Sequence, residues 1–246
     1  MIKDIIRTAC QKLIGYKNYL FLFSLFTIRR IKSGSHEEEF IFFMGMTPAE
    51  GTILDIGANI GIMTASLARR FPKAKVYAFE PIPNNIEALE KVVKHFKLQN
   101  VTLFKTALGE EKGELKMILP VINNAKMQGL SHVVEDDAQG STEKGMQYTV
   151  PVLKLDDIPE LQNAPAITAI KIDVENFEYY VLKGGEAMLR KHMPLIYCEL
   201  WDNDRRKLCM EYLTGLGYRI DIFDGKQLIP FTGQPVINFF FIPKDK

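Results

Sequence analysis

The stretch Asp55-Ile56-Gly57-Ala58-Asn59-Ile60-Gly61 joins an apolar segment to a helical one through two glycines. Residues 53–56 suit a strand buried on both faces of a parallel sheet, and residues 62–68 suit a helix. Glycine lacks a Cβ, so it adopts unusual backbone angles and lets a ligand come close, while the helix start offers free N–H groups. The stretch therefore predicts a cofactor-binding turn, although plain packing of helix on strand would explain the two glycines equally well.

The spacing of the glycines bears on the choice between two cofactors, NAD and S-adenosylmethionine. The dinucleotide fingerprint Gly-x-Gly-x-x-Gly has a middle glycine that lets the pyrophosphate approach the backbone, and Asn59 stands in its place. Asp55 suits the ammonium group of methionine better than it suits phosphates. The strand at 76–79 leads into Glu80, nineteen residues after Gly61, where a carboxylate can accept hydrogen bonds from both ribose hydroxyls. These features favour S-adenosylmethionine.

Length and composition set the limits of the fold. The chain has 246 residues, 47% of them hydrophobic, which predicts a globular domain, residues 47–246, preceded by a helical extension, residues 1–46. A formal charge of +1 argues against a nucleic-acid partner, for which a strongly basic face is expected. Three scattered cysteines without paired spacing predict a reducing location, the cytoplasm, and no structural metal.

The extension begins with apolar residues at helical spacing through residues 2–14, which predicts an amphipathic helix. Residues 19–28 are strongly apolar, but ten residues fall short of the about twenty that span a hydrocarbon core. We expect the extension to pack on the domain or on a second copy in a homodimer. Peripheral membrane contact is the alternative, and the basic residues that would support it are Lys3, Arg7, Lys12, Arg29 and Arg30.

Strands and helices alternate along the rest of the chain, as in βαβ units with a parallel sheet. Between two of the strands, residues 120–145 are polar and have little periodicity. A long loop of this kind is a substrate-covering lid or a solvated insertion. We expect strands at 53–56, 76–79, 101–104, 114–119, 147–152, 167–174, 195–200, 219–223 and 236–242, and helices at 62–71, 84–96, 177–182 and 204–216.

Several motifs resemble those of a known family. They are Asp-Ile-Gly-Ala-Asn-Ile-Gly at 55–61, Ala-Phe-Glu-Pro at 78–81, Thr-Ala-Leu-Gly at 106–109 and Lys-Ile-Asp-Val-Glu at 171–175, followed by Val-Leu-Lys-Gly at 181–184. In this order they closely resemble the FkbM family of S-adenosylmethionine-dependent methyltransferases, over residues 51–242. The resemblance implies the Rossmann-like α/β fold of class I methyltransferases, a seven-stranded, mostly parallel sheet with an antiparallel terminal strand. It also implies methyl transfer, usually to an oxygen of a sugar or small natural product.

The resemblance also implies which residues hold the cofactor. Residues of the turn would surround its methionine part, Glu80 would bind its ribose, and two residues of the third motif would lie near its adenine. Asn176 stands where the family usually has glycine, and asparagine tolerates a left-handed backbone better than most residues. The residues assigned to the methionine part are Asp55, Gly57, Asn59 and Gly61, and those assigned to the adenine are Ala107 and Leu108.

Methyl transfer to a hydroxyl needs a base that draws away the proton, and carboxylates at strand ends are the candidates. Asp173 and Glu199 each follow an apolar run, and ligands of open α/β sheets bind outside the carboxyl ends of the strands. Asp173 is the first candidate and Glu199 the second. His132, in the predicted lid, is the alternative because its ordinary pKa lies near neutrality.

Three functions are compatible with the sequence. An O-methyltransferase acting on a small molecule or saccharide fits the motifs best. A domain that keeps the cofactor site but serves as a scaffold without turnover is the second, and an NAD-dependent oxidoreductase is the third. The residues do not identify the acceptor.

Overall fold

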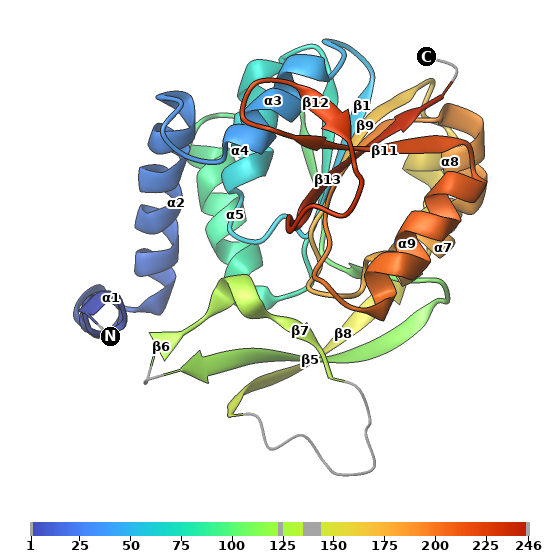
Figure 1. Ribbon diagram of the computed structural model, residues 1–246. Helices are drawn as coiled ribbons and strands as arrows, with labels where there is room; N and C mark the ends of the chain where they lie inside the picture. The colour runs from blue at the N-terminus through green and yellow to red at the C-terminus, as the bar shows by residue number, and fades with distance from the viewer. Residues whose placement is uncertain (1, 123–124, 135–143, 245–246) are drawn as a thin grey trace.

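The computed structural model describes residues 2–122, 125–134 and 144–244, with only the backbone for residues 2–6. A central sheet lies between two layers of helices, and a second, smaller sheet lies across one end of it (Figure 1). The described elements are α1 (Ile2–Ile14), α2 (Tyr16–Lys32), α3 (Glu38–Met46), β1 (Thr52–Ile56), α4 (Ile62–Arg70), β2 (Lys75–Phe79), α5 (Pro83–His95), β3 (Val101–Phe104), β4 (Ala107–Leu108), β5 (Gly113–Ile122), β6 (Ala125–Lys126), the 3-10 helix η1 (Gln128–Leu130), β7 (His132–Val133), β8 (Gly145–Leu153), the 3-10 helix η2 (Leu155–Asp157), α6 (Pro159–Gln162), β9 (Ile167–Ile172), α7 (Glu178–Lys183), α8 (Glu186–His192), β10 (Leu195–Glu199), α9 (Asp204–Gly215), β11 (Tyr218–Phe223), β12 (Leu228–Pro230) and β13 (Asn238–Pro243).

The central sheet has the strand order β12-β11-β13-β10-β9-β1-β2-β3. Strands β1, β2, β3, β9 and β10 pair in parallel, whereas β13 pairs antiparallel with both β10 and β11, between which it lies. This arrangement confirms the predicted class I methyltransferase-like fold. The short β12, antiparallel to β11, adds an eighth strand at the edge.

All five residues of β1 are buried, because helices cover both faces of the sheet. In Figure 1, α2, α4 and α5 lie on one face, and α7, α8 and α9 lie on the other. Successive side chains of a strand point to opposite faces. Accordingly, Ile53 packs in the core that contains Leu67 of α4, and Leu54 packs in the core that contains Val181 of α7. A continuous apolar run in the sequence thus serves two separate cores.

The N-terminal extension packs on the domain, which is one of the arrangements that the sequence predicts for it. Helix α2 lies against α4 and α5, and the buried hydroxyl of Ser24 donates a 3.0 Å hydrogen bond to the carbonyl of Ile60 in the cofactor turn. Helix α3 buries Phe40 and Phe43 completely, and Phe43 stacks on Tyr197 of β10. Among the residues that the structure describes, no helix is sufficiently long and apolar to cross a bilayer.

The second sheet corrects two expectations. The strands predicted at 114–119 and 147–152 exist, but as β5 and β8 they pair antiparallel with each other and not with the central sheet. Residues 120–145 are not one irregular loop, because the described part contains β6, η1 and β7, and both short strands pair with β5. Residues 123–124 and 135–143 of the predicted lid lie outside the described part of the chain. We call the segment Ala125 to Val133 the roof segment.

Candidate functional site

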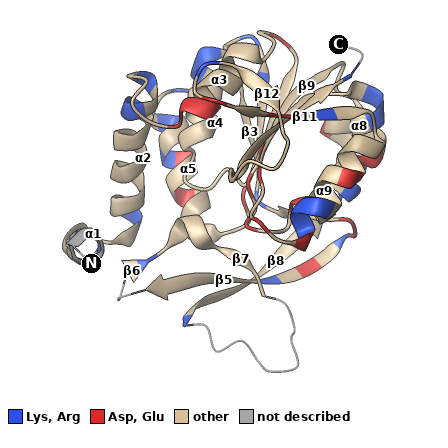
Figure 2. Cartoon of the chain, viewed as in Figure 1, with Lys and Arg blue, Asp and Glu red and all other residues tan. Residues whose placement is uncertain are grey.

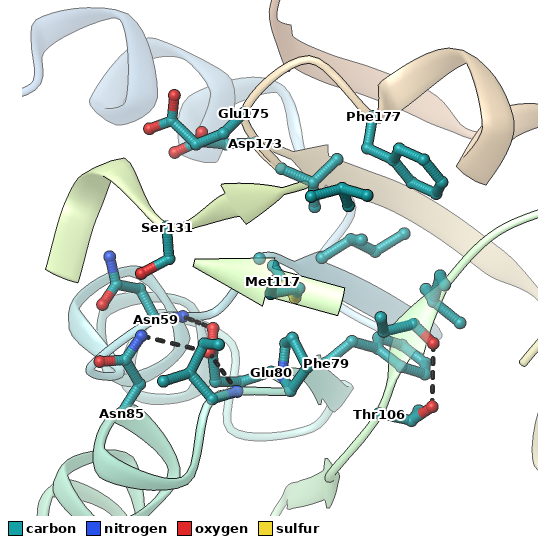
Figure 3. A pocket seen from close by; sticks show the side chains of 18 of the residues that line it. Asn59, Phe79, Glu80, Asn85, Thr106, Met117, Ser131, Asp173, Glu175 and Phe177 are labelled. Atoms are coloured by element: carbon teal, nitrogen blue, oxygen red, sulfur yellow. Dashed lines mark hydrogen bonds between the residues drawn. The ribbon is translucent and has the colours of Figure 1, made fainter. Parts of the chain in front are cut away.

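A pocket lies between the carboxyl ends of β1, β2 and β9 and the second sheet. In Figure 3, Asn59, Glu80 and Asn85 lie toward one end of the pocket, and Asp173 and Glu175 lie toward the other. The residues that line the pocket include Gly57, Asn59, Phe79, Glu80, Asn85, Thr106, Ala107, Leu108, Gln128, Ser131, Asp173, Glu175 and Phe177.

The two glycines of the turn have different neighbours. Gly57 has φ 75°, and a Cβ there would lie 1.8 Å from the carbonyl oxygen of Asp173. Gly61 has φ 82°, and a Cβ there would lie 2.5 Å from Leu89 Cδ1 of α5. Only Gly57 borders the pocket. Close backbone and helix packing therefore accounts for Gly61, and it contributes to the need for glycine at position 57.

Glu80 is the best-held side chain in the pocket. Its Oε2 accepts a 2.8 Å hydrogen bond from the Asn59 amide, and its Oε1 accepts from the Ile82 amide at 2.9 Å and from Asn85 Nδ2 at 3.1 Å. Burial raises its pKa to about 7 against these lowering hydrogen bonds. A carboxylate offers about four acceptor positions, so Oε2 keeps one for a ligand hydroxyl.

Two further acceptors at this end lack a partner. The buried side-chain oxygens of Asn59 and Asn85 have no hydrogen bond within the described structure. Buried polar atoms are nearly always paired, so unpaired ones beside a pocket indicate groups that a ligand satisfies. Ribose hydroxyls and an ammonium group are donors of the required kind.

The rest of the lining near the Glu80 end of the pocket is mostly apolar. Phe79, Ala107 and Leu108 line it, together with Phe177 from the start of α7. The Thr106 hydroxyl donates to the carbonyls of Ala107 and Pro151, both at 2.9 Å, and so holds β4 against β8. A narrow apolar wall with an aromatic ring suits a flat heterocycle such as adenine.

Asp55 does not border the pocket. It is fully buried, its Oδ2 accepts a hydrogen bond from the Thr64 hydroxyl, and its Oδ1 lies 3.6 Å from Lys171 Nζ. The same ammonium lies 3.6 Å from Asp173 and donates a 2.9 Å hydrogen bond to the carbonyl of Gly57. Burial lowers the pKa of Lys171, but the nearby Asp173, Asp55 and Glu199 carboxylates raise it more. Asp55 and Lys171 thus support the turn from within the core, outside the pocket.

The far end of the pocket is acidic. Asp173 and Glu175 line it, whereas Glu199, at the end of β10, does not. Burial and the neighbouring Asp173 raise the pKa of Glu175 to about 8 and that of Glu199 to about 7. Glu175 and Asn176 have φ values of 53° and 72°, which confirms the left-handed turn expected at position 176.

His132 is not brought to the pocket. It lies on β7, its ring Nδ1 is 2.9 Å from the carbonyl of Leu130, and its neighbours Ser131 and Val133 line the pocket while it does not. Alternation along an extended segment explains this difference. Its catalytic role therefore lacks support from its position.

Four residues at or beside the pocket are not predicted from the sequence. The motif at 171–175 does not indicate that Lys171 contacts two carboxylates, and no pattern singles out Asn85, Gln128 or Phe177 as lining residues. The apolar run around Lys171 was a usable signal, because a lysine in a buried strand needs carboxylate partners. For Gln128 no local signal exists.

The charge of the lining restricts the ligand. Three carboxylates, Glu80, Asp173 and Glu175, border the pocket, and no lysine or arginine does so within the described residues. A pyrophosphate would find no cationic side chain among the described lining residues, whereas a sulfonium and an ammonium would be attracted to those carboxylates that are ionised. The residues present therefore fit S-adenosylmethionine.

Comparison with known proteins agrees with this geometry. The family model of the methyltransferase FkbM domain matches residues 55–220, more than half of the chain. Methyltransferase 1 of Beauveria bassiana is 28% identical over 192 residues, 71% of this chain and 72% of that one. The hexuronic acid methyltransferase AglP of Haloferax volcanii is 28% identical over 172 residues, 69% of this chain and 65% of that one. The solved structure of methyltransferase FkbM from Methylobacillus flagellatus superposes with a TM-score of 0.55 at 20% identity, covering 80% of this chain and 45% of that one. The chain belongs to the FkbM methyltransferase family.

Proposed function

We propose that the protein transfers a methyl group from S-adenosylmethionine to a hydroxyl of a saccharide or small natural product. The observation that carries the proposal is the polarity of one pocket. Its Glu80 end offers unpaired acceptors for ribose and ammonium donors, and its Asp173 end offers carboxylates at the place where an acceptor would enter. The similarity to a hexuronic acid methyltransferase supports a sugar-like acceptor.

When bound, S-adenosylmethionine supplies the methyl group, whose carbon bonds to the acceptor oxygen as its bond to sulfur breaks. Glu80 would hold the ribose, and the apolar part of the lining, which includes Phe79 and Phe177, would hold the adenine. Asp173, kept in place by Lys171, accepts the hydroxyl proton in the transition state. Glu175, with its pKa of about 8, carries a proton much of the time at neutral pH and donates a hydrogen bond to the acceptor.

Methyl transfer from labelled S-adenosylmethionine to a panel of hexuronic acids, neutral sugars, hydroxylated small molecules and RNA tests the proposal. We expect label in acid-stable ethers of a sugar or small molecule. Label in RNA alone, or on nitrogen, would refute the acceptor class. Calorimetry with S-adenosylhomocysteine and NAD is the second test, and tighter binding of NAD would refute the cofactor. Binding of S-adenosylhomocysteine with no transfer to any acceptor would favour the scaffold alternative.

The location that fits the thiols is the cytoplasm, because Cys10, Cys198 and Cys209 are all free and two of them are buried. We further propose that the outer face of α2 contacts an anionic bilayer. Leu22 and Phe26 are 51% and 57% exposed, and the last turn of the helix carries Arg29, Arg30 and Lys32, which Figure 2 shows at the end of α2 nearer α3. Apolar and basic side chains on one helix face suit a lipid interface.

Sedimentation with vesicles tests this surface. The protein should pellet with vesicles of phosphatidylcholine and phosphatidylglycerol but not with phosphatidylcholine alone, and Phe26→Ser should reduce the bound fraction. Failure to pellet, or concentration-dependent dimers that Phe26→Ser abolishes, would assign this face to a second copy instead.

A further inference from the structure

The roof segment carries a polar side chain that the fold does not satisfy. Gln128 is only 8% exposed, it is one of the residues that line the pocket, and its Oε1 has no hydrogen-bond partner within the described structure. Its backbone is well held, since the Gln128 carbonyl accepts a hydrogen bond from the Ser131 hydroxyl at 3.2 Å. A buried carboxamide oxygen without a partner is unfavourable in the free protein, and a ligand donor in the pocket would satisfy it.

The N-terminal helix α1 contacts the roof segment on the side away from the pocket. None of the described residues of α1 lines the pocket itself. Gln11 makes a reciprocal pair with the backbone of Lys126, donating to its carbonyl and accepting from its amide, both at 3.1 Å. Arg7 contacts the sulfur of Met127, the residue directly before Gln128. A glutamine side chain thus completes the free edge of β6 as a neighbouring strand would.

The three unpaired acceptors of the pocket belong to different parts of the chain. Asn59 lies in the turn, Asn85 on α5 and Gln128 on the roof, and all three border the same pocket. The cofactor that fits this pocket has two ribose hydroxyls and an ammonium group as donors, which matches acceptors on opposite sides. The acidic end, by contrast, has no unpaired carboxamide within the described residues.

We propose that Gln128 is a cofactor-binding residue whose Oε1 accepts a hydrogen bond from S-adenosylmethionine, and that α1, through Gln11, is the positioning element that holds it there. This inference rests on the proposed function. It gives the N-terminal extension a part in substrate binding at a site that the turn alone does not complete.

Calorimetric titration with S-adenosylhomocysteine, without acceptor, tests the inference. Gln128→Ala should weaken binding about three- to tenfold, the range of one neutral hydrogen bond. Gln128→Glu, which keeps an acceptor oxygen at that place, should bind at least as tightly as the parent. The matched control is Gln147→Ala, an exposed glutamine of β8 on the same sheet. Unchanged affinity of Gln128→Ala would overturn the proposal, as would a raised acceptor KM without change in affinity.

The role of α1 has its own comparison. Gln11→Ala should weaken S-adenosylhomocysteine binding about two- to fivefold, while Lys12→Ala, an exposed change on the same helix, should not. Thermal midpoints of the ligand-free variants separate binding from folding: Gln128→Ala should not lower the midpoint, since it removes an unsatisfied group. A midpoint that falls together with affinity would make Gln128 structural and overturn the inference. If the parent itself fails to bind S-adenosylhomocysteine, the proposed function fails instead.

Discussion

The two walls of the pocket are built in opposite ways. The cofactor turn and Glu80 come from consecutive strand, turn and helix units, and the carboxylate bonds to the amide of Asn59 across two neighbouring strands. The roof segment comes from a hairpin, a short 3-10 helix and a two-residue strand, and it depends on pairing with β5 and on contacts from α1. The first wall is part of the central sheet and is supported by Lys171 of β9 as well as by its own unit, whereas the second lies outside that sheet.

Because the two walls are built differently, we expect substitutions in them to have different effects on stability and on ligand binding. The turn is supported by buried Asp55 and Lys171, so changes in it affect the core as well as ligand binding. The roof segment borders the pocket through residues such as Gln128 and Ser131, and its strands pair with β5 and not with the central sheet. We expect substitutions in the turn to destabilise the protein and substitutions in the roof to change affinity alone.

The largest effect is expected from Gly57→Ala. The new Cβ would lie 1.8 Å from the carbonyl oxygen of Asp173, at a φ of 75° that side chains disfavour. We expect a loss of at least about 3 kcal/mol in the free energy of unfolding, with no detectable cofactor binding. Gly45→Ala is the control, because nothing lies within 4 Å of a Cβ there and the residue is helical. Urea unfolding measures both, and an unchanged midpoint for Gly57→Ala would contradict the packing described at the turn.

The second effect separates the carboxylates at the acidic end. Asp173→Asn should slow single-turnover methyl transfer about 10²- to 10⁴-fold at saturating cofactor, as expected for loss of a positioned base. Glu199→Gln should change the rate less, because Glu199 does not line the pocket, and His132→Ala should change it least. A rate within about threefold of the parent for Asp173→Asn would remove base catalysis by this residue.

How far the sequence predicts each wall follows from the same difference. The turn and Glu80 are predictable from the sequence, because both depend on residues within one βαβ unit. The sequence predicts that Asp55 lies at the turn. It does not predict that Asp55 is buried in the core, because that depends on Lys171 of β9, the strand that pairs with β1. The position of Gln128 and the strands β6 and β7 are not predictable from local patterns, because two-residue strands leave no periodicity and their register depends on β5.

The third effect concerns the ribose. Glu80→Gln removes the charge that strengthens hydrogen bonds to the ribose, each worth roughly 1.5–3 kcal/mol. The parent should prefer S-adenosylhomocysteine over an analogue lacking the ribose hydroxyls by about tenfold to a hundredfold, and the variant should lose most of that preference. Calorimetry gives the ratio of the two affinities within each protein, which cancels any loss of folding. An unchanged ratio would place the ribose elsewhere.

The smallest effect is a pH dependence of stability, and it compares the two ends of the pocket. Burial raises the pKa of Glu80 to about 7 and that of Glu175 to about 8, from an ordinary 4.5. Between these values the folded protein binds more protons than the unfolded chain. This contribution to stability is therefore complete below about pH 4.5 and is lost as the pH rises through about 7 to 8.

Thermal unfolding between pH 5 and pH 9 measures this contribution. We expect the midpoint of the ligand-free parent to fall over this range, by about 2–4 °C for each kcal/mol of stability lost. Glu175→Gln should reduce the fall throughout the range up to about pH 8 and should remove most of the part between pH 7 and 8, because Glu80, Glu178 and Glu199 contribute only up to about pH 7. Glu111→Gln, on an exposed turn away from the pocket, should follow the parent curve. S-Adenosylmethionine should flatten the parent curve, because its positive charge favours the ionised carboxylates, whereas S-adenosylhomocysteine, which lacks the sulfonium, should flatten it less. Equal curves for parent and Glu175→Gln would show that the acidic end does not hold its protons, and the donor role of Glu175 toward the acceptor would then fail while the ribose site stands.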